Sequence, residues 1–261
     1  MRRPIASCQR VFILAGMLLP LPAVAMPLPD CAGTIEATRA HVVRVEKNGV
    51  LILNDGRAVM LEGIRLPGAD RPSDAIASAA LDALRALAMK ETLTLTVTPP
   101  ERDRYDRLHV QAFGDVWLQT ELLKRGLARV SIAPDRQECS PDFYEAEVEA
   151  RNARRGLWAQ PEFAVRQAGS LSVPAGSFQI VEGRVLNVAS HDSRMFLDFS
   201  LDYRKGFSAT IAPEDRKAFR GSDPALEELT GHEIRLRGIV EYFNGRPEIA
   251  LSNPKQVEII H

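Results

Sequence analysis

The chain has 261 residues with 33 basic and 34 acidic side chains, so its formal net charge at pH 7 is −1. A near-neutral chain has no global field that attracts polyanions, which excludes nucleic-acid binding driven by overall charge and leaves only a local patch for that role. The length is sufficient for two small domains with separate hydrophobic cores.

Residues 1–25 have the pattern of a secretory signal peptide. The basic residues Arg2 and Arg3 are followed by an apolar stretch and by Ala23-Val24-Ala25, which matches a small-residue cleavage site. The alternative is a membrane anchor, but Pro20 and Pro22 interrupt the apolar stretch, which is shorter than the ~20 residues that a spanning helix needs. We therefore expect a secreted or periplasmic protein without a transmembrane anchor after cleavage.

The next part of the chain predicts an α+β domain over residues 35–162. Strand-like runs alternate with amphipathic helical segments, and Asn54-Asp55-Gly56 marks a tight turn. The expected strands cover residues 41–45, 50–53, 58–61, 92–98 and 107–113, and the expected helices cover 74–90, 116–125 and 142–155. Five short strands with interleaved helices predict a five-stranded OB-like barrel that carries helices.

A small-residue segment follows, and then a mostly β domain. Residues 163–175 are predicted to be a linker, because Trp158-Ala159-Gln160-Pro161 ends the charged helix and Gly, Ser and Pro follow. In the domain at 176–261, strands are expected at 178–188, 195–201, 207–211, 232–243 and 247–251, with a short helix at 213–219. This order predicts a second OB-like β-barrel.

Two cysteines remain beyond the predicted signal peptide, which contains Cys8. A pair such as Cys31 and Cys139 in an oxidising compartment indicates one disulfide. The alternative is two unrelated buried thiols, because pairing cannot be read from a sequence.

Five segments of the first domain occur in a characteristic order. They are Val45–Val50, Met60–Gly68, Asp103–Arg107, Leu122–Ala128 and Glu147–Trp158. In this order the domain resembles the staphylococcal nuclease (thermonuclease) family, and the resemblance covers about half of the chain. It implies a fold whose relatives hydrolyse phosphodiesters, a reaction that requires a Ca²⁺ held by carboxylates, a carboxylate base and two arginines.

The resemblance also implies that most of this active site has been replaced. The two metal carboxylates fall on Asn48 and Arg65, the first arginine on Met60 and the general base on Gly68. A guanidinium repels a divalent cation, and a thioether cannot donate a hydrogen bond to phosphate. We therefore expect a degenerate site without a metal cofactor, and Ca²⁺ only if the site has been rebuilt from other side chains.

What remains of the family's site lies in Asp103–Arg107. The resemblance makes Arg107 a remnant phosphate contact, with Tyr105 beside it and Asp103 as a possible remnant of a metal-proximal carboxylate. Asp106 stands where the family prefers glycine. The alternative is that Asp103, Asp106 and Arg107 form surface ion pairs, each worth ~0–1 kcal/mol.

The second domain offers a candidate nucleic-acid face. Strand alternation directs Phe196 outward together with Arg194, and it directs Arg235 and Arg237 away from the core. An aromatic side chain among arginines is typical of proteins that bind single strands. The alternative is that Phe196 packs against neighbouring structure and that the arginines pair with glutamates of their own strand.

Three functions therefore remain open. The first is an exported, non-catalytic thermonuclease-like module that binds nucleic acid or a protein. The second is an active divalent-dependent phosphodiesterase with a rebuilt site, so whether the chain is an enzyme stays undecided. The third is an envelope protein in which both domains are scaffolds. The expected partners are single-stranded nucleic acid, bound weakly, or an envelope protein.

Overall fold

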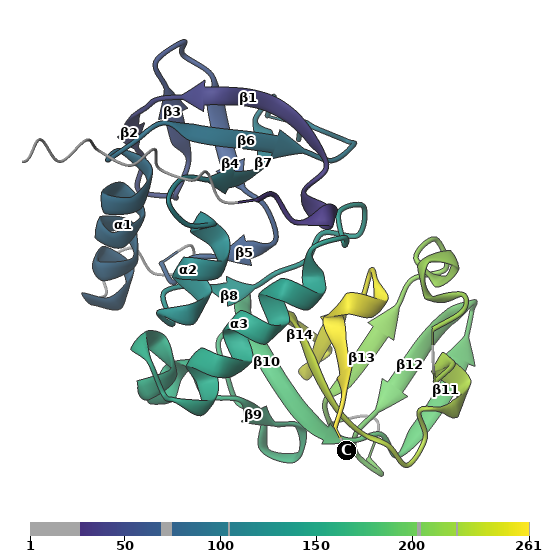
Figure 1. Ribbon diagram of the computed structural model, residues 1–261. Helices are drawn as coiled ribbons and strands as arrows, with labels where there is room; N and C mark the ends of the chain where they lie inside the picture. Colours follow the sequence, from purple (N-terminus) through teal and green to yellow (C-terminus); the bar gives the residue numbers. More distant parts are fainter. Residues whose placement is uncertain (1–26, 69–74, 104, 203–204, 223, 261) are drawn as a thin grey trace, which may run out of the picture.

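The structure, a computed structural model, consists of two sheet-based halves that lie against each other (Figure 1). The predicted signal peptide lies outside the described residues, and no helix in the described part of the chain is both long and apolar enough to cross a membrane. The described residues are 27–68, 75–103, 105–202, 205–222 and 224–260.

The first half contains a six-stranded mixed sheet with the order β1-β6-β7-β4-β3-β2. Its strands are β1 (Thr34–Ala40), β2 (Val42–Val45), β3 (Leu51–Leu53), β4 (Ala58–Leu61), β6 (Leu93–Val97) and β7 (Leu108–Phe113). Strands β4 and β7 pair in parallel, and the other neighbours are antiparallel. A separate two-stranded sheet joins β5 (Ile64–Arg65) to β8 (Arg129–Val130).

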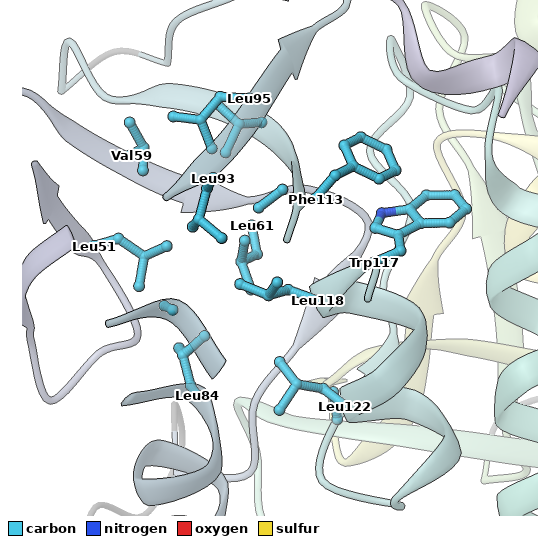
Figure 2. Close-up of a cluster of buried hydrophobic side chains, with 14 of the residues drawn as sticks. Leu51, Val59, Leu61, Leu84, Leu93, Leu95, Phe113, Trp117, Leu118 and Leu122 are labelled. Carbon is cyan, nitrogen blue, oxygen red and sulfur yellow. The ribbon is translucent and has the colours of Figure 1, made fainter. Parts of the chain in front are cut away.

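Three helices accompany this sheet: α1 (Ala75–Ala88), α2 (Leu118–Lys124) and α3 (Ser140–Asn152). Helix α1 buries Ile76, Ala80 and Leu84, which recur at helical spacing, and Leu84 belongs to the core of the first half. Figure 2 shows leucines of β3, β6, α1 and α2 converging in one core, with Phe113 and Trp117 at one side. The ring centroids of these two aromatic residues lie 5.3 Å apart.

The second half is mostly β, with an eight-stranded sheet in which β16 pairs with β14 beside the main order β11-β12-β13-β15-β14-β10-β9. Its strands are β9 (Arg166–Gln167), β10 (Ser177–Arg184), β11 (Asn187–His191), β12 (Arg194–Asp198), β13 (Ser208–Ile211), β14 (Glu233–Phe243), β15 (Arg246–Ala250) and β16 (Val257–Ile259). The expected helix at 213–219 is a short 3-10 helix, η5 (Arg216–Phe219).

The two halves share one topology. Strands β1, β2, β3, β4, β6 and β7 correspond in chain order and in pairing to β10, β11, β12, β13, β14 and β15. The parallel pair β4–β7 is matched by the parallel pair β13–β15, and the other matched pairs are antiparallel. The predicted fold class, an OB-like α+β domain followed by a mostly β OB-like domain, is confirmed. The chain is a tandem of two related folds.

Apolar contacts join the halves. Besides one core in each half, a smaller cluster packs Phe178 and Ile180 of β10 against Ile76, Leu157 and Trp158 of the first domain. The predicted linker contains β9 and η4 (Ala168–Ser170), and Ala168 belongs to the second core. This segment is therefore packed against the second domain along part of its length.

A disulfide fixes the start of the first domain. The sulfur atoms of Cys31 and Cys139 are bonded at 2.05 Å, with their Cα atoms 5.1 Å apart, so the predicted pairing is confirmed. The bond joins η1 (Asp30–Ala32) to the residue that precedes α3.

Candidate functional site

Asp103 is the centre of a polar cluster at the start of β7. The Nε and Nη2 atoms of Arg107 lie 2.8 and 2.7 Å from Asp103 Oδ2, and the backbone N–H groups of Tyr105 and Arg107 donate to Oδ1. His109 Nε2 lies 3.3 Å from Oδ2. Burial raises the pKa of Asp103, but these hydrogen bonds outweigh burial and hold that pKa well below its usual range. Asp103 is therefore an ionised partner of Arg107.

Tyr105 and Arg107 lie together, as the resemblance implies. The guanidinium carbon of Arg107 is 4.9 Å from the centroid of the Tyr105 ring, and Tyr105 is 63% exposed. Asp103 compensates the charge of Arg107, so the two form an ion pair, which was the alternative to a phosphate contact. The same arginine also stacks on Tyr105. A phosphate that approached Arg107 would have to compete with Asp103.

The position of the family's first arginine is apolar. Met60 in β4 stands directly opposite His109 in β7. Burial and the positive charge of Arg136 lower the pKa of His109, although the hydrogen bond to Asp103 opposes this shift. A thioether beside an imidazole with a lowered pKa gives phosphate little positive charge to bind.

The two implied metal positions do not fit Ca²⁺. Asn48 Oδ1 accepts a hydrogen bond from the backbone N–H of Val50 at 3.2 Å, and Arg65 places its guanidinium 5.6 Å from the ring centroid of Phe178 in β10. Gly68, at the base position, borders a cavity of ≈ 140 Å³ that Phe178 also lines. Among the described residues, no group of three or more His, Cys, Asp or Glu side chains is placed to hold a metal ion.

Glu62 is a carboxylate that lies close to the replaced positions in sequence. Its side chain is 5% exposed, and Oε2 has no hydrogen-bond partner in the described structure. Burial raises the pKa of Glu62 to about 8, and the charge of Arg136 offsets only part of this shift. Within the residues that the structure describes, Glu62 belongs to no group of three or more His, Cys, Asp or Glu side chains placed to hold a metal ion.

Comparison with known proteins identifies relatives of the first domain. Residues 58–160 match the family model described as "Staphylococcal nuclease homologue". The first domain belongs to the staphylococcal nuclease-like family. A probable endonuclease, LCL3 from Leptosphaeria maculans, is 30% identical over 130 residues, which are 44% of this chain and 43% of that protein. The chain thus spans less than half the length of this curated relative.

The nuclease-like domain covers part of the candidate nucleic-acid face of the second domain and leaves another part exposed. Arg237 points away from its own core, as predicted, but it is 1% exposed and contacts Glu147 of α3, so the prediction that it faces solvent is wrong. Arg235 lies on the same side of β14, where Glu182 and Glu258 bind it at 2.7 and 3.5 Å. The first domain covers this face of β14, although strand alternation alone predicts that the face is exposed to solvent.

Phe196 and Arg194 of β12 lie elsewhere. Arg194 is exposed and Phe196 is half-buried, and the guanidinium carbon of Arg246 lies 5.7 Å from the Phe196 ring. Arg246 is a candidate that sequence analysis missed. A signal was present, because Arg246 follows the turn Asn244-Gly245 as Arg107 follows Tyr105-Asp106.

Proposed function

We propose that this protein is an exported pseudoenzyme of the nuclease-like family that binds nucleic acid without hydrolysing it. The orientation of Arg65 carries the proposal. At a position where the family implies a metal carboxylate, this guanidinium lies over Phe178 of the second domain. A cation at this place would meet a positive charge and an aromatic ring instead of oxygen ligands.

The other replaced positions support the same conclusion. Gly68 supplies no base, and loss of a general base costs ~10²–10⁴ in rate. Met60 supplies no hydrogen-bond donor to the phosphoryl oxygens, and loss of one such donor costs ~10²–10³. Because Arg107 is already paired with Asp103, its contribution to charge stabilisation is reduced as well.

Nucleic acid is the partner that the family favours. The exposed Tyr105 ring next to Arg107 offers stacking and a phosphate contact. The near-neutral net charge and the Asp103–Arg107 pair make the expected affinity weak and sensitive to salt. An envelope protein remains the partner to consider if no nucleic acid binds.

A second candidate function is a phosphodiesterase with a rebuilt site. The contact between His109 and Asp103, with Arg107 on the same carboxylate, favours it, because a carboxylate that orients a histidine beside an arginine is a recurring acid–base arrangement. The relative from Leptosphaeria maculans, a probable endonuclease, supports this candidate.

Export is a separate part of the proposal. The signal-like pattern of residues 1–25 and the disulfide between Cys31 and Cys139 both favour an oxidising compartment. Intact-mass measurement of the protein from the periplasm or medium of a bacterial host tests it. We expect a chain that begins at Met26, and a chain that keeps residues 1–25 in the cytoplasm contradicts export.

Incubation of the purified chain, without residues 1–25, with labelled single- and double-stranded DNA and RNA tests the function. Ca²⁺, Mg²⁺ or a chelator is added, and both the bound fraction and the length of the recovered oligonucleotide are measured. We expect weak binding and full-length product in every condition. Chelator-sensitive shortening favours a divalent-dependent enzyme, shortening that persists with chelator favours His109-based chemistry, and no binding points to a protein partner.

A further inference from the structure

The second domain repeats the position of Arg107. In the shared topology β15 corresponds to β7, and Arg246 begins β15 as Arg107 immediately precedes β7. Two residues later, Glu248 stands opposite Ser208 of β13, just as His109 stands opposite Met60 of β4. The corresponding place on the second fold therefore carries an arginine and polar partners.

A groove of ≈ 570 Å³ lies at this place. Phe196, Leu186 and Leu201 form much of its apolar wall, and Asn187, Asp198 and Arg246 contribute polar groups. Leu201 is 92% exposed and Leu186 is 39% exposed. Large apolar side chains that are exposed to solvent beside a few polar groups are typical of a ligand site. The volume of the groove is in the range of small-ligand pockets.

Asp198 in the groove and Glu248 next to Arg246 both accept hydrogen bonds. Asp198 Oδ1 accepts a hydrogen bond from Ser208 Oγ at 2.7 Å, and Glu248 Oε1 accepts one from Arg246 Nε at 2.9 Å. Arg246 offsets the charge of Glu248, and a phosphate at Arg246 has to compete with this carboxylate, as a phosphate at Arg107 competes with Asp103. With Arg246 at one side of the Phe196 ring, the groove combines an aromatic surface with a cation.

We propose that this groove binds an unpaired base of a single-stranded nucleic acid, stacked against Phe196, with the adjoining phosphate near Arg246 and Arg194. The proposal rests on the proposed function and locates its main contact in the second domain. A base inside a duplex has no free face to stack on an aromatic side chain, so the groove selects single strands. Asn187 and Asp198 lie where the polar edge of a base would be.

Fluorescence anisotropy with a labelled single-stranded oligonucleotide, at low and at moderate salt, tests the proposal on the full mature chain. The test variants are Phe196→Leu, which keeps an apolar side chain, and Arg246→Gln. We expect Phe196→Leu to weaken binding about fivefold or more, given the usual contribution of base–aromatic stacking. Arg246→Gln should weaken binding and reduce its dependence on salt.

Phe243→Leu is the matched control, because it removes an exposed aromatic ring that does not line the groove, by the same substitution. We expect this variant to bind within about twofold of wild type, since contacts outside the main site contribute little. Tyr105→Leu is measured beside it, because it removes the candidate stacking contact of the nuclease-like domain. A loss in Tyr105→Leu but not in Phe196→Leu overturns the groove and leaves the proposed function standing. If duplex and single strand bind equally well and Phe196→Leu changes neither affinity, the groove is likewise overturned and the proposed function stands. No binding at low salt overturns both, and an unchanged melting temperature verifies that each variant is folded.

Discussion

Arg237 of the second domain and Glu147 of α3 form a buried ion pair between the two domains. Arg237 Nη1 lies 2.9 Å from Glu147 Oε2, and the side chains are 1% and 0% exposed. Glu147 Oε1 also accepts the backbone N–H of Val130 at 2.7 Å, and Arg237 Nη2 reaches Glu258 of β16. The domains are therefore joined by charges as well as by apolar contacts, and they should unfold together.

Replacing Arg237 with methionine should destabilise the whole chain. The substitution removes the nearer of the two arginines that face the buried Glu147, with Arg151 left at 3.9 Å, and loss of one member of a buried pair costs ~3–5 kcal/mol. Denaturant unfolding followed by both tryptophan fluorescence and circular dichroism measures the change. The double variant Arg237→Met/Glu147→Gln should recover part of the loss, because the stranded charge is removed.

Arg184→Met is the matched control for this prediction. Arg184 pairs with Glu233 at 3.7 Å and its side chain is 62% exposed, so its loss should cost ~0–1 kcal/mol. If Arg237→Met costs no more than this control, the pair does not hold the domains together.

The disulfide should supply a large part of the stability of the nuclease-like domain. Cys31 and Cys139 are separated by 108 residues, and closing a loop of this length stabilises the folded chain by ~4–5 kcal/mol in the chain-entropy model. We expect reduction, or the variant Cys31→Ser/Cys139→Ser, to lower the free energy of unfolding by about this amount. Two reactive thiols in the unfolded, non-reduced protein would contradict the pairing.

Glu62 should make stability depend on pH. Its pKa in the folded chain is about 8, above the value of an ordinary glutamate, so folding favours the protonated form. The resulting stabilisation is complete below the unfolded pKa and is lost as the pH rises through about 8. Relative to wild type, Glu62→Gln should gain ~1.4 kcal/mol per pH unit between these limits. Urea unfolding at a series of pH values measures the free energy of unfolding of both proteins. If the difference between them does not change with pH, Glu62 has the same pKa in the folded and the unfolded chain, and the prediction is wrong.

Ca²⁺ should leave the melting temperature unchanged. A ligand that binds the folded state at a hundred times its dissociation constant stabilises it by ~2.7 kcal/mol. Because Asn48 and Arg65 do not form a cation site, excess Ca²⁺ and chelator should give the same thermal unfolding curve. A Ca²⁺-dependent rise that Asn48→Ala abolishes would reveal a site that these contacts do not explain.

Much of the fold could be predicted because local patterns and packing agree. The helix at Ala75–Ala88 repeats apolar residues at helical spacing, whereas β1 escaped prediction because most of its side chains are exposed and give no alternating apolar pattern. Once residues 1–25 were set aside, the two remaining cysteines indicated a disulfide but left two unpaired thiols open, and the structure shows the bond.

The site was harder to predict, because the sequence of a strand does not show which helix of another domain packs on its outer face. Alternation correctly placed Arg237 off the core of its own sheet, but only the packed structure shows that α3 covers that face. Arg246 was missed because its importance comes from a topology repeated between domains, and hydrophobic patterning does not reveal such a repeat.

The rate at which the mature chain cleaves single-stranded DNA, with the protein in excess, tests the central claim most directly. The reaction is followed with Ca²⁺, with Mg²⁺ and with chelator, for wild type and for Arg107→Ala. Because Asn48 and Arg65 do not form a cation site, Gly68 supplies no base and Arg107 is paired with Asp103, we expect the same background rate in all of these reactions. Cleavage by wild type that the chelator stops and Arg107→Ala abolishes would contradict the account, because it would establish a working, rebuilt nuclease site.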